Sequence, residues 1–429
     1  MDDEVTAEAY DRQAAAFLAQ GRQAEATGAL CAAMALRDGS ALAFYNLGTA
    51  YLQANRLAEA EAWYRRALAA DADLVAANQN LAVVLERLGR LDEAAPFRAR
   101  ALARHWLQVE EAGPEAPRVL ILAASGLGNV PLDALLPRGR TTRLVWFLEY
   151  APDAGESLPP YDLVFNAIGD ADLAGPAAAT LAAFLARNTR PLLNRPARVA
   201  LTRRHAMPEL LGDIPDLVVP PVLRWRAGPE GAAALTAVLA ARQDMPPPWL
   251  LRPIGSHGGI GLVRCDDAAA LAALALRSGE DYYLTAFHDY RGPDGFFRKY
   301  RLIFVDGVPY PYHLAISPQW LVHYGSAGMR GEAWKRAEEE RFLADPGAVL
   351  GKRAMTAITQ VARRLDLEFA GIDCALLPDG RVLLFEANAT MNVHLNDPPD
   401  LFAYKHRFVP RIFAAFTAML ERRLIPANH

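Results

Sequence analysis

Residues 369–388 read Phe369-Ala-Gly-Ile-Asp373-Cys-Ala-Leu-Leu-Pro-Asp-Gly380-Arg-Val-Leu-Leu-Phe-Glu386-Ala-Asn388. Two apolar runs on either side of a Pro-Asp-Gly turn predict a β-hairpin. Glu386 and Asn388 are two residues apart, so they share a strand face, and the partner strand can place Asp373 opposite them. Such oxygen ligands are what Mg²⁺ prefers at sites that handle nucleotide triphosphates. The alternative, solvated hairpin charges, is disfavoured because Glu386 directly follows an apolar run.

A glycine-rich loop lies upstream, where Trp249-Leu-Leu-Arg252 is followed by Gly255-Ser256-His257-Gly258-Gly259-Ile-Gly261. The pattern predicts a strand, a turn and a returning strand. Glycines let backbone N–H groups close on phosphate oxygens, and Arg252 adds a cation beside the loop. An ordinary hairpin turn with flexible glycines is the alternative interpretation.

In their order and separation, these motifs resemble the ATP-grasp superfamily, particularly its glutathione-synthetase-like and ribosomal-protein-modification branch. The resemblance runs from about residue 117 to about residue 420. It implies an α/β domain followed by an ATP-grasp fold, with ATP and two Mg²⁺ ions as cofactors. It also implies an ADP-forming carboxylate–amine ligase that works through an acyl phosphate.

The resemblance also implies roles for individual residues. Arg252 stands where the family usually has lysine, and Thr285 and Ala286 replace the side chain that would bind the adenine amine. His313 would compensate for a missing second arginine, or it is a structural imidazole. The implied residues are Asp373, Glu386 and Asn388 for metal; Arg204 (with Arg203 as the alternative), Arg252, Ser256, His257, Gly258, Gly259, Thr285 and Phe287 for ATP; and Arg301 and His313 for catalysis.

A second pattern occupies residues 1–111, where Phe17, Tyr51 and Leu85 recur every 34 residues. This is the period of tetratricopeptide repeats. Gly or Asn recurs at the turns, where a left-handed helix end is wanted. We therefore expect an all-α domain of three repeats, with residues 102–111 as a capping helix.

Beyond a linker at 111–117, short apolar runs alternate with helical patterns. They predict an α/β domain over 117–245, and Pro246-Pro-Pro248 marks the start of the ATP-grasp domain at 246–429. The sequence Gly126-x-Gly128, with Glu149 ending the next strand, superficially fits a dinucleotide fingerprint. Pro131 stands where the third glycine would be, which argues against it.

Composition limits the remaining choices. The 429 residues carry a net charge of −4 with both signs interspersed, which favours neither a nucleic acid nor a membrane partner. The apolar runs are too short to span a bilayer, and the acidic start is unlike a signal peptide, so we expect a cytoplasmic protein. Its three cysteines lack metal-ligand spacing.

The predicted activity is therefore ligation of a peptide or protein substrate recognised by the repeats, or of a small-molecule carboxylate or amine. Homo-oligomerisation is another role for the repeats. The alternatives are a catalytically weak nucleotide-binding scaffold, or phosphotransfer to a different acceptor on the same fold.

Overall fold

The computed structural model describes residues 6–125, 128–153, 155–172, 175–256 and 258–424. The chain forms two compact units. The first contains the residues up to 108 together with 147–152, and the second contains 109–146 and 153–429. Within the described residues, no helix is both long and apolar enough to cross a bilayer.

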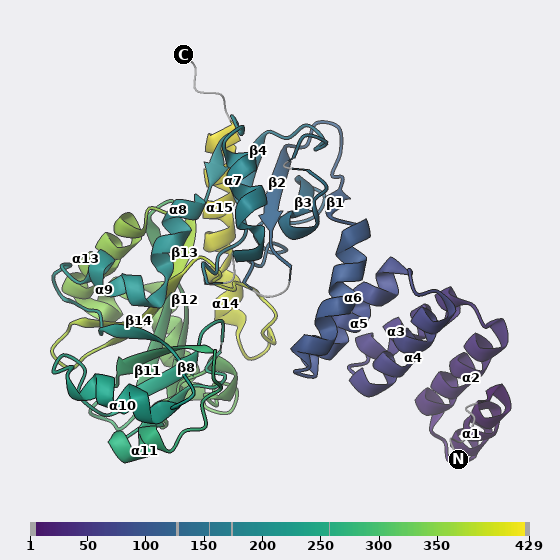
Figure 1. The fold of residues 1–429 in the computed structure, drawn as a ribbon, viewed down its shortest axis with the longest axis horizontal. Helices are drawn as coiled ribbons and strands as arrows, with labels where there is room; N and C mark the ends of the chain where they lie inside the picture. The colour runs from purple at the N-terminus through teal and green to yellow at the C-terminus, as the bar shows by residue number, and fades with distance from the viewer. Residues whose placement is uncertain (1–5, 126–127, 154, 173–174, 257, 425–429) are drawn as a thin grey trace. The chain divides into compact units, whose positions relative to one another are not determined.

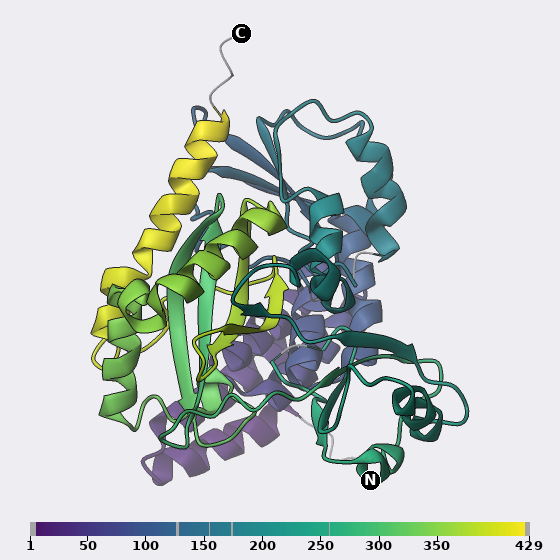
Figure 2. The ribbon, with the colours of Figure 1, turned by 90° about the vertical axis from the view of Figure 1, so that its left-hand side faces the viewer.

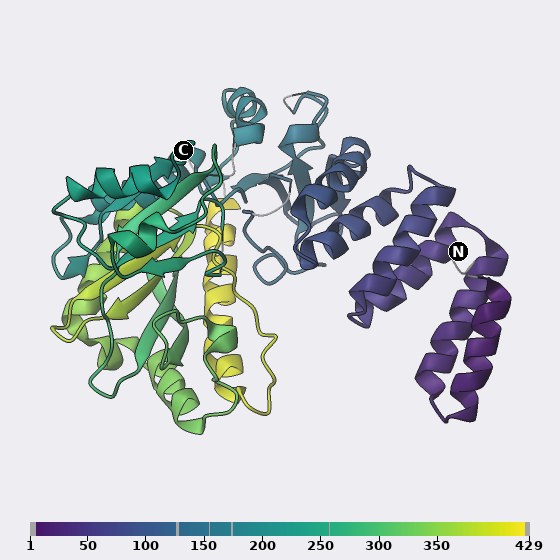
Figure 3. The same ribbon diagram turned by 60° about the horizontal axis from the view of Figure 1, so that its bottom comes forward.

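The first unit is a stack of helix pairs (Figures 1 and 3). Asn55, Gly21 and Gly89 adopt positive φ angles at the turns inside the three pairs, as their spacing predicts. The buried face is rich in alanine, which lets the helices approach closely. The helices are α1 (Ala7–Ala19), α2 (Gln23–Asp38), α3 (Ala41–Gln53), α4 (Leu57–Ala70), α5 (Val75–Arg87) and α6 (Leu91–Arg104).

The prediction of a capping helix at residues 102–111 is wrong. Helix α6 ends at Arg104, and Leu107–Glu110 forms strand β1 at the edge of a sheet. Apolar Leu107 and Val109 alternate with polar neighbours, which suits a strand, and Glu110 pairs with the buried Arg143 of strand β3. These long-range interactions outweigh the tendency to continue the helix.

The second unit contains most of three sheets. Their strand orders are β1-β3-β2-β4-β5, β7-β10-β8-β9 and β12-β11-β13-β14-β6. The first two sheets contain β2 (Arg118–Ala123), β3 (Thr142–Phe147), β4 (Leu163–Asn166), β5 (Leu192–Leu193), β7 (Val222–Arg226), β8 (Trp249–Pro253), β9 (Val263–Cys265) and β10 (Asp281–Ala286). The third contains β6 (Leu217–Val218), β11 (Phe297–Val305), β12 (Val308–Ser317), β13 (Phe369–Leu376) and β14 (Val382–Asn388).

Helices flank these sheets (Figure 2). They are α7 (Ala178–Leu185), α8 (Pro196–Val199), α9 (Met207–Leu211), α10 (Ala232–Ala240), α11 (Ala268–Ala272), α12 (Ala333–Ala344), α13 (Pro346–Leu365), α14 (Ala403–Phe408) and α15 (Pro410–Leu424). The predicted fold class, an all-α repeat stack followed by mixed α/β sheets, is confirmed.

The boundary expected at residue 246 does not separate the sheets. Strand β6 pairs with β14, and β7 pairs with β10, although both precede that residue. Apart from residues 147–152, both expected domains also fall within the second compact unit. Pairing between strands far apart in sequence leaves no mark on the local pattern from which the boundary was predicted.

Strand β11 has two faces with different neighbours. Leu302 and Phe304 belong to the cluster that includes α13, whereas Ile303 and Val305 pack with the α15 cluster. Because side chains alternate along a strand, Lys299 and Arg301 share the face of Ile303. This face is apolar at the end of β11 and charged towards its start, where the candidate site lies.

Candidate functional site

The β13–β14 hairpin brings the two predicted acidic metal ligands together. Asp373 lies directly opposite Glu386 in the register, and Asn388 lies opposite Gly371. Ala387, between Glu386 and Asn388, points into the core. A side chain at position 371 would approach the Leu302 carbonyl oxygen to 2.7 Å, so glycine permits the close strand packing.

Two cations of β11 hold Asp373. Arg301 donates to both carboxylate oxygens, at 2.6 and 2.8 Å, and the Lys299 Nζ lies 3.1 Å from Oδ2. Burial opposes ionisation of Asp373, but the charges of Arg301 and Lys299 outweigh it and hold its pKa well below the usual range. The carboxylate is therefore ionised, as a metal ligand must be.

Glu386 has a different cation, Arg204, which begins a short 3₁₀ turn at Arg204–Ala206. Arg204 forms an ion pair with Glu386 and donates to the Phe385 carbonyl oxygen at 3.2 Å. Burial raises the pKa of Glu386, but the Arg204 charge opposes this effect, and the net shift of the pKa is downward. Of the two cations considered from the sequence, Arg204 reaches the carboxylate hairpin. Arg203 instead lies beside Asp172.

The donor atoms fit a hard divalent cation. Two carboxylates and one amide oxygen share one face of the hairpin, and all are oxygen donors. The Asn388 Oδ1 accepts hydrogen bonds from the Thr390 N–H at 3.0 Å and hydroxyl at 3.2 Å, which orients the amide. Among the described residues, no group of three or more His, Cys, Asp or Glu side chains could hold a metal ion.

The glycine-rich loop joins β8 to β9 as expected, and Arg252 lies at its base. Arg252 donates to the Ser256 Oγ at 3.1 and 3.2 Å and also to the Ser256 carbonyl. Burial, together with the nearby Arg204 charge, lowers the pKa of Arg252 to about 10. Gly258 and Gly259 have φ angles of +63° and +82°, a conformation that side chains disfavour. His257 lies outside the described residues.

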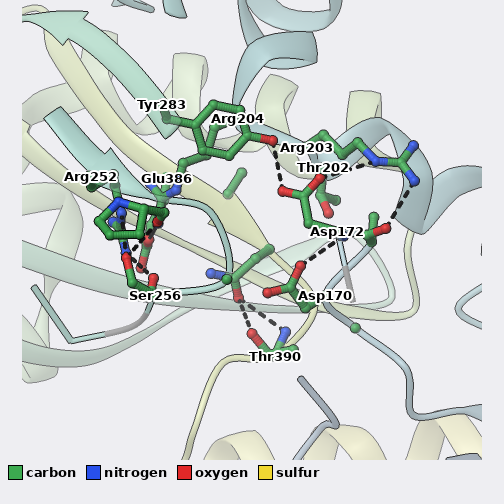
Figure 4. A pocket seen from close by; sticks show the side chains of 16 residues that line it. Asp170, Asp172, Thr202, Arg203, Arg204, Arg252, Ser256, Tyr283, Glu386 and Thr390 are labelled. Atoms are coloured by element: carbon green, nitrogen blue, oxygen red, sulfur yellow. Dashed lines mark hydrogen bonds and ion pairs between the residues drawn. The ribbon is translucent and has the colours of Figure 1, made fainter. Parts of the chain in front are cut away.

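Several of these groups line one pocket (Figure 4). Predicted residues Arg204, Arg252, Ser256, Glu386 and Asn388 line it. Asp373, Arg301, Gly258 and Gly259 lie outside its lining, although Asp373 faces the lining residue Glu386 across the hairpin. The remaining lining residues are Gly169, Asp170, Ala171, Asp172, Thr202, Arg203, Pro253, Gly255, Tyr283, Ala387 and Thr390.

Thr285 and Phe287, expected at the adenine, lie outside the lining of this pocket. The Thr285 hydroxyl donates to the Pro221 carbonyl at 2.8 Å, and the Phe287 N–H donates to the Pro248 carbonyl at 2.7 Å. The Arg264 guanidinium lies over the Phe287 ring at 4.3 Å. Their polar contacts tie β10 to neighbouring backbone.

His313 lies opposite Arg301 across the β11–β12 pair and is 6% exposed. Its Nδ1 has no hydrogen-bond partner. Burial and then the Arg301 charge hold the pKa of His313 well below its usual value, so the imidazole is neutral. A neutral imidazole cannot supply the positive charge of a missing arginine.

Lys299 is a residue that the sequence reasoning missed. It supplies a second positive charge beside Asp373, on the same face of β11 as Arg301. The spacing of two between Lys299 and Arg301 was a usable signal, because a strand puts such residues on one face.

Tyr283 and Asp172 were also missed. Tyr283 pairs in register with Arg252, and its hydroxyl donates to Asp172 at 2.7 Å. The His205 Nδ1 lies 3.2 Å from the same hydroxyl. Burial and the hydrogen bond to Asp172 raise the pKa of Tyr283, which stays protonated. Asp172 comes from the segment after β4, far from Tyr283 in sequence, so no local signal could have linked them.

Residues 41–74 match the model of the tetratricopeptide repeat family, and they contain helices α3 and α4. The predicted repeats are thereby confirmed. No curated protein matches the chain.

Several solved structures of ATP-grasp ligases and related proteins are similar to the chain. The VanG D-Ala:D-Ser ligase from Enterococcus faecalis is 12% identical, covers 72% of this chain and 100% of its own, and has a TM-score of 0.44. A RimK domain ATP-grasp protein from Sphaerobacter thermophilus is 17% identical, with coverages of 72% and 99% and a TM-score of 0.39. The ATP-grasp ligase PsnB, complexed with a precursor peptide and AMPPNP, is 14% identical, with coverages of 72% and 98% and a TM-score of 0.39. Likenesses this distant transfer neither an activity nor a residue's role to this chain.

Proposed function

We propose that the chain is an ATP-dependent carboxylate–amine ligase of the ATP-grasp type. The observation that carries the proposal is one pocket that combines Arg252 and Arg204 with Glu386 and Asn388. Cations suited to phosphate oxygens thus lie beside oxygen donors suited to Mg²⁺. Residues from separate stretches of the sequence, between Arg204 and Asn388, line this pocket.

In this proposal, Arg252, Arg204 and the loop residues Ser256, His257, Gly258 and Gly259 hold the phosphates of ATP. Asp373, Glu386 and Asn388 hold Mg²⁺, which when bound would neutralise phosphate charge. Thr285 and Phe287 lie at the adenine end. With Mg²⁺ held by these carboxylates, Arg204 and Lys299, which now pair with Glu386 and Asp373, would be available to contact the anionic substrates.

Arg301 and Lys299 orient the substrate carboxylate and stabilise the charge that develops as its oxygen attacks the γ-phosphate. The bond between the γ-phosphate and ADP breaks, and an acyl phosphate forms. An amine then displaces phosphate from the acyl phosphate to give an amide. The neutral His313, which is buried opposite Arg301, has a positioning role in this proposal and carries no compensating charge.

The acceptor in this proposal is a peptide or protein that binds the repeats. Tetratricopeptide repeats present an extended surface formed by stacked helices, which suits such a partner. The repeats therefore supply recognition, and the second unit supplies the chemistry.

The test is an ATP turnover assay over a panel of amino acids and peptides, with all products identified. The proposal requires ADP, phosphate and a new amide in equal amounts. AMP with pyrophosphate would exclude this mechanism, and a phosphorylated acceptor without free phosphate would identify a phosphotransferase. ATP binding without turnover on any acceptor would favour a scaffold.

A further inference from the structure

A groove in the first unit lies between the first two helix pairs, lined by side chains from α1 to α4 and their turns. Three half-buried aromatic residues, Tyr10, Phe17 and Tyr51, form much of its apolar surface. Trp63 is only 3% exposed and stacks on Phe44 with ring centroids 5.9 Å apart, so it forms part of a rigid wall.

Part of the charge in the groove is structural. Arg22 pairs with Glu25 and covers the Phe17 ring at 4.4 Å. Arg56, 34 residues later, pairs with Glu59 and covers the Tyr51 ring at 4.7 Å. Because this arrangement recurs with the repeat, it belongs to the architecture. Each pair is internally neutral.

Arg66 breaks this pattern. Its guanidinium carbon lies 4.8 Å from the centre of the Trp63 ring, and its Nη1 is buried without a hydrogen-bond partner. Among the residues that the structure describes, no carboxylate forms an ion pair with it. A buried guanidinium nitrogen with no acceptor is unfavourable, so an anion brought into the groove would be stabilised there. Arg66 thus leaves the groove with one uncompensated positive charge.

The lining of the groove also departs from the repeat at a second position. Trp63 and Phe97 occupy equivalent positions 34 residues apart, whereas the first repeat has Ala29 at that position. Ala29 lines the groove. A small side chain therefore stands where the other two repeats carry an aromatic ring, and this leaves room for a ligand side chain.

We propose that this groove binds an acidic segment of a peptide or protein partner, with a carboxylate on Arg66 and a neighbouring apolar side chain against Tyr10, Phe17 and Tyr51. A guanidinium suits a carboxylate because it donates two parallel hydrogen bonds. The inference deepens the proposed function by naming the chemistry of its partner, and it rests on the proposed recognition role of the repeats.

The experiment begins with selection of short peptides from a random display library on the full-length protein. Enrichment of Asp or Glu next to an apolar residue is expected. The best acidic peptide and its counterpart with Glu or Asp replaced by Gln or Asn are then labelled and titrated by fluorescence anisotropy. We expect about tenfold weaker binding of the amide peptide, which corresponds to about 1.4 kcal/mol.

The protein variants are Arg66→Gln, Arg66→Lys and, as the matched control, Arg65→Gln. Arg65 is an exposed neighbour that already pairs with Glu61 at 2.8 Å. Arg66→Gln should weaken binding of the acidic peptide by about tenfold. It should leave binding of the amide peptide unchanged, because that peptide already lacks the carboxylate with which Arg66 would interact. Arg66→Lys should lose less affinity for the acidic peptide, and Arg65→Gln should bind that peptide as tightly as the wild type does.

Selection without acidic enrichment, no selected peptide, or equal binding by Arg66→Gln and the wild type would each overturn the inference. A circular dichroism melt of each variant separates lost binding from lost folding. Mg·ATP titration of Arg66→Gln should match the wild type. Failure of the wild type itself to bind Mg·ATP would count against the ligase proposal and leave the peptide result intact.

Discussion

Glu386 connects the parts of the candidate site, because it faces Asp373 across the hairpin and pairs with Arg204. In the variant Glu386→Gln, the shape is kept but the charge that would bind metal is lost. We expect Mg·ATP turnover to fall by about 100-fold or more, the scale seen when one preorganised electrostatic group is removed. A coupled ADP-release assay at several Mg²⁺ concentrations measures it.

The matched control is Glu340→Gln, since Glu340 is an exposed glutamate of α12. It should keep wild-type turnover. Near-normal turnover by Glu386→Gln, with an unchanged Mg²⁺ requirement, would remove Glu386 from the site.

Arg252 and Arg301 are expected to affect different steps. Arg252 lies at the base of the glycine loop, so Arg252→Ala should raise the dissociation constant for ATP by about tenfold or more. In the proposed reaction, Arg301 stabilises charge that develops only as the bond forms, so Arg301→Ala should lower the single-turnover rate more than the affinity for ATP. Calorimetric titration and rapid quench give the two quantities, and equal effects on both would refute the separation.

His313 predicts a pH dependence of stability. Its pKa in the folded protein lies well below the usual value, so on acidification the unfolded chain takes up the proton first. The free energy of unfolding should therefore fall as pH drops below about 6.5, by up to about 1.4 kcal/mol per pH unit, until the folded-state pKa is reached. The groups that shape this shift are Arg301, Asp373, Lys405 and Lys299.

Urea unfolding of the wild type and His313→Gln at several pH values between neutral and mildly acidic measures this contribution. Other histidines titrate equally in both proteins, so the difference between the two curves isolates His313. The free energy of unfolding of the wild type minus that of His313→Gln should decrease as pH falls. Parallel curves would mean that His313 is not held neutral by its surroundings.

At the scale of elements, helices α3 and α4 pack closely because Gly48 has no side chain. A Cβ there would lie 2.8 Å from the Tyr64 ring. Tyr64 is fully buried, and its hydroxyl donates a hydrogen bond to the Thr49 hydroxyl at 3.1 Å. Gly48→Ala should therefore destabilise this pair by about 1–3 kcal/mol, despite the better helix propensity of alanine. Hydrogen exchange of the α3 and α4 amides measures this local stability.

Gly28→Ala is the control, since the nearest atom to its Cβ is the Tyr51 hydroxyl at 3.7 Å. That substitution should be neutral or stabilise α2 by up to about 1 kcal/mol. Equal loss of protection in both variants would show that the Gly48 contact has no special importance.

For the whole molecule, strand β1 decides where the part that holds the candidate site can be cut from the repeats. Arg143 is 4% exposed and pairs with Glu110 of β1 as well as with Asp133 at 3.0 Å. A chain that starts at residue 106 keeps β1, whereas one that starts at 115 loses it. We expect the shorter chain to be less stable by about 1–3 kcal/mol, because a buried charge loses a partner.

Thermal melts and Mg·ATP calorimetry on both truncated chains test this expectation. The chain from residue 106 should bind Mg·ATP like the full-length protein, since every residue of the candidate site lies beyond the cut. If both truncated chains are insoluble or lose ATP binding, the repeats are needed for the stability of the part that holds the candidate site.

Local patterns in the sequence determined much of this protein. The Pro-Asp-Gly turn and the period of two placed Asp373, Glu386 and Asn388 on one face of a hairpin, because strand geometry follows from neighbouring residues. The 34-residue period likewise predicted the helix pairs, since each repeat is a local unit.

Only the tertiary structure decided which distant groups meet. It paired Arg204 with Glu386 across 182 positions of sequence, brought Asp172 to Tyr283, and placed β1, β6 and β7 in sheets with strands far along the chain. It also showed that Lys299, and not the neutral His313, adds charge beside Asp373. Burial and long-range pairing depend on the packing of the whole chain, so no local periodicity encodes them.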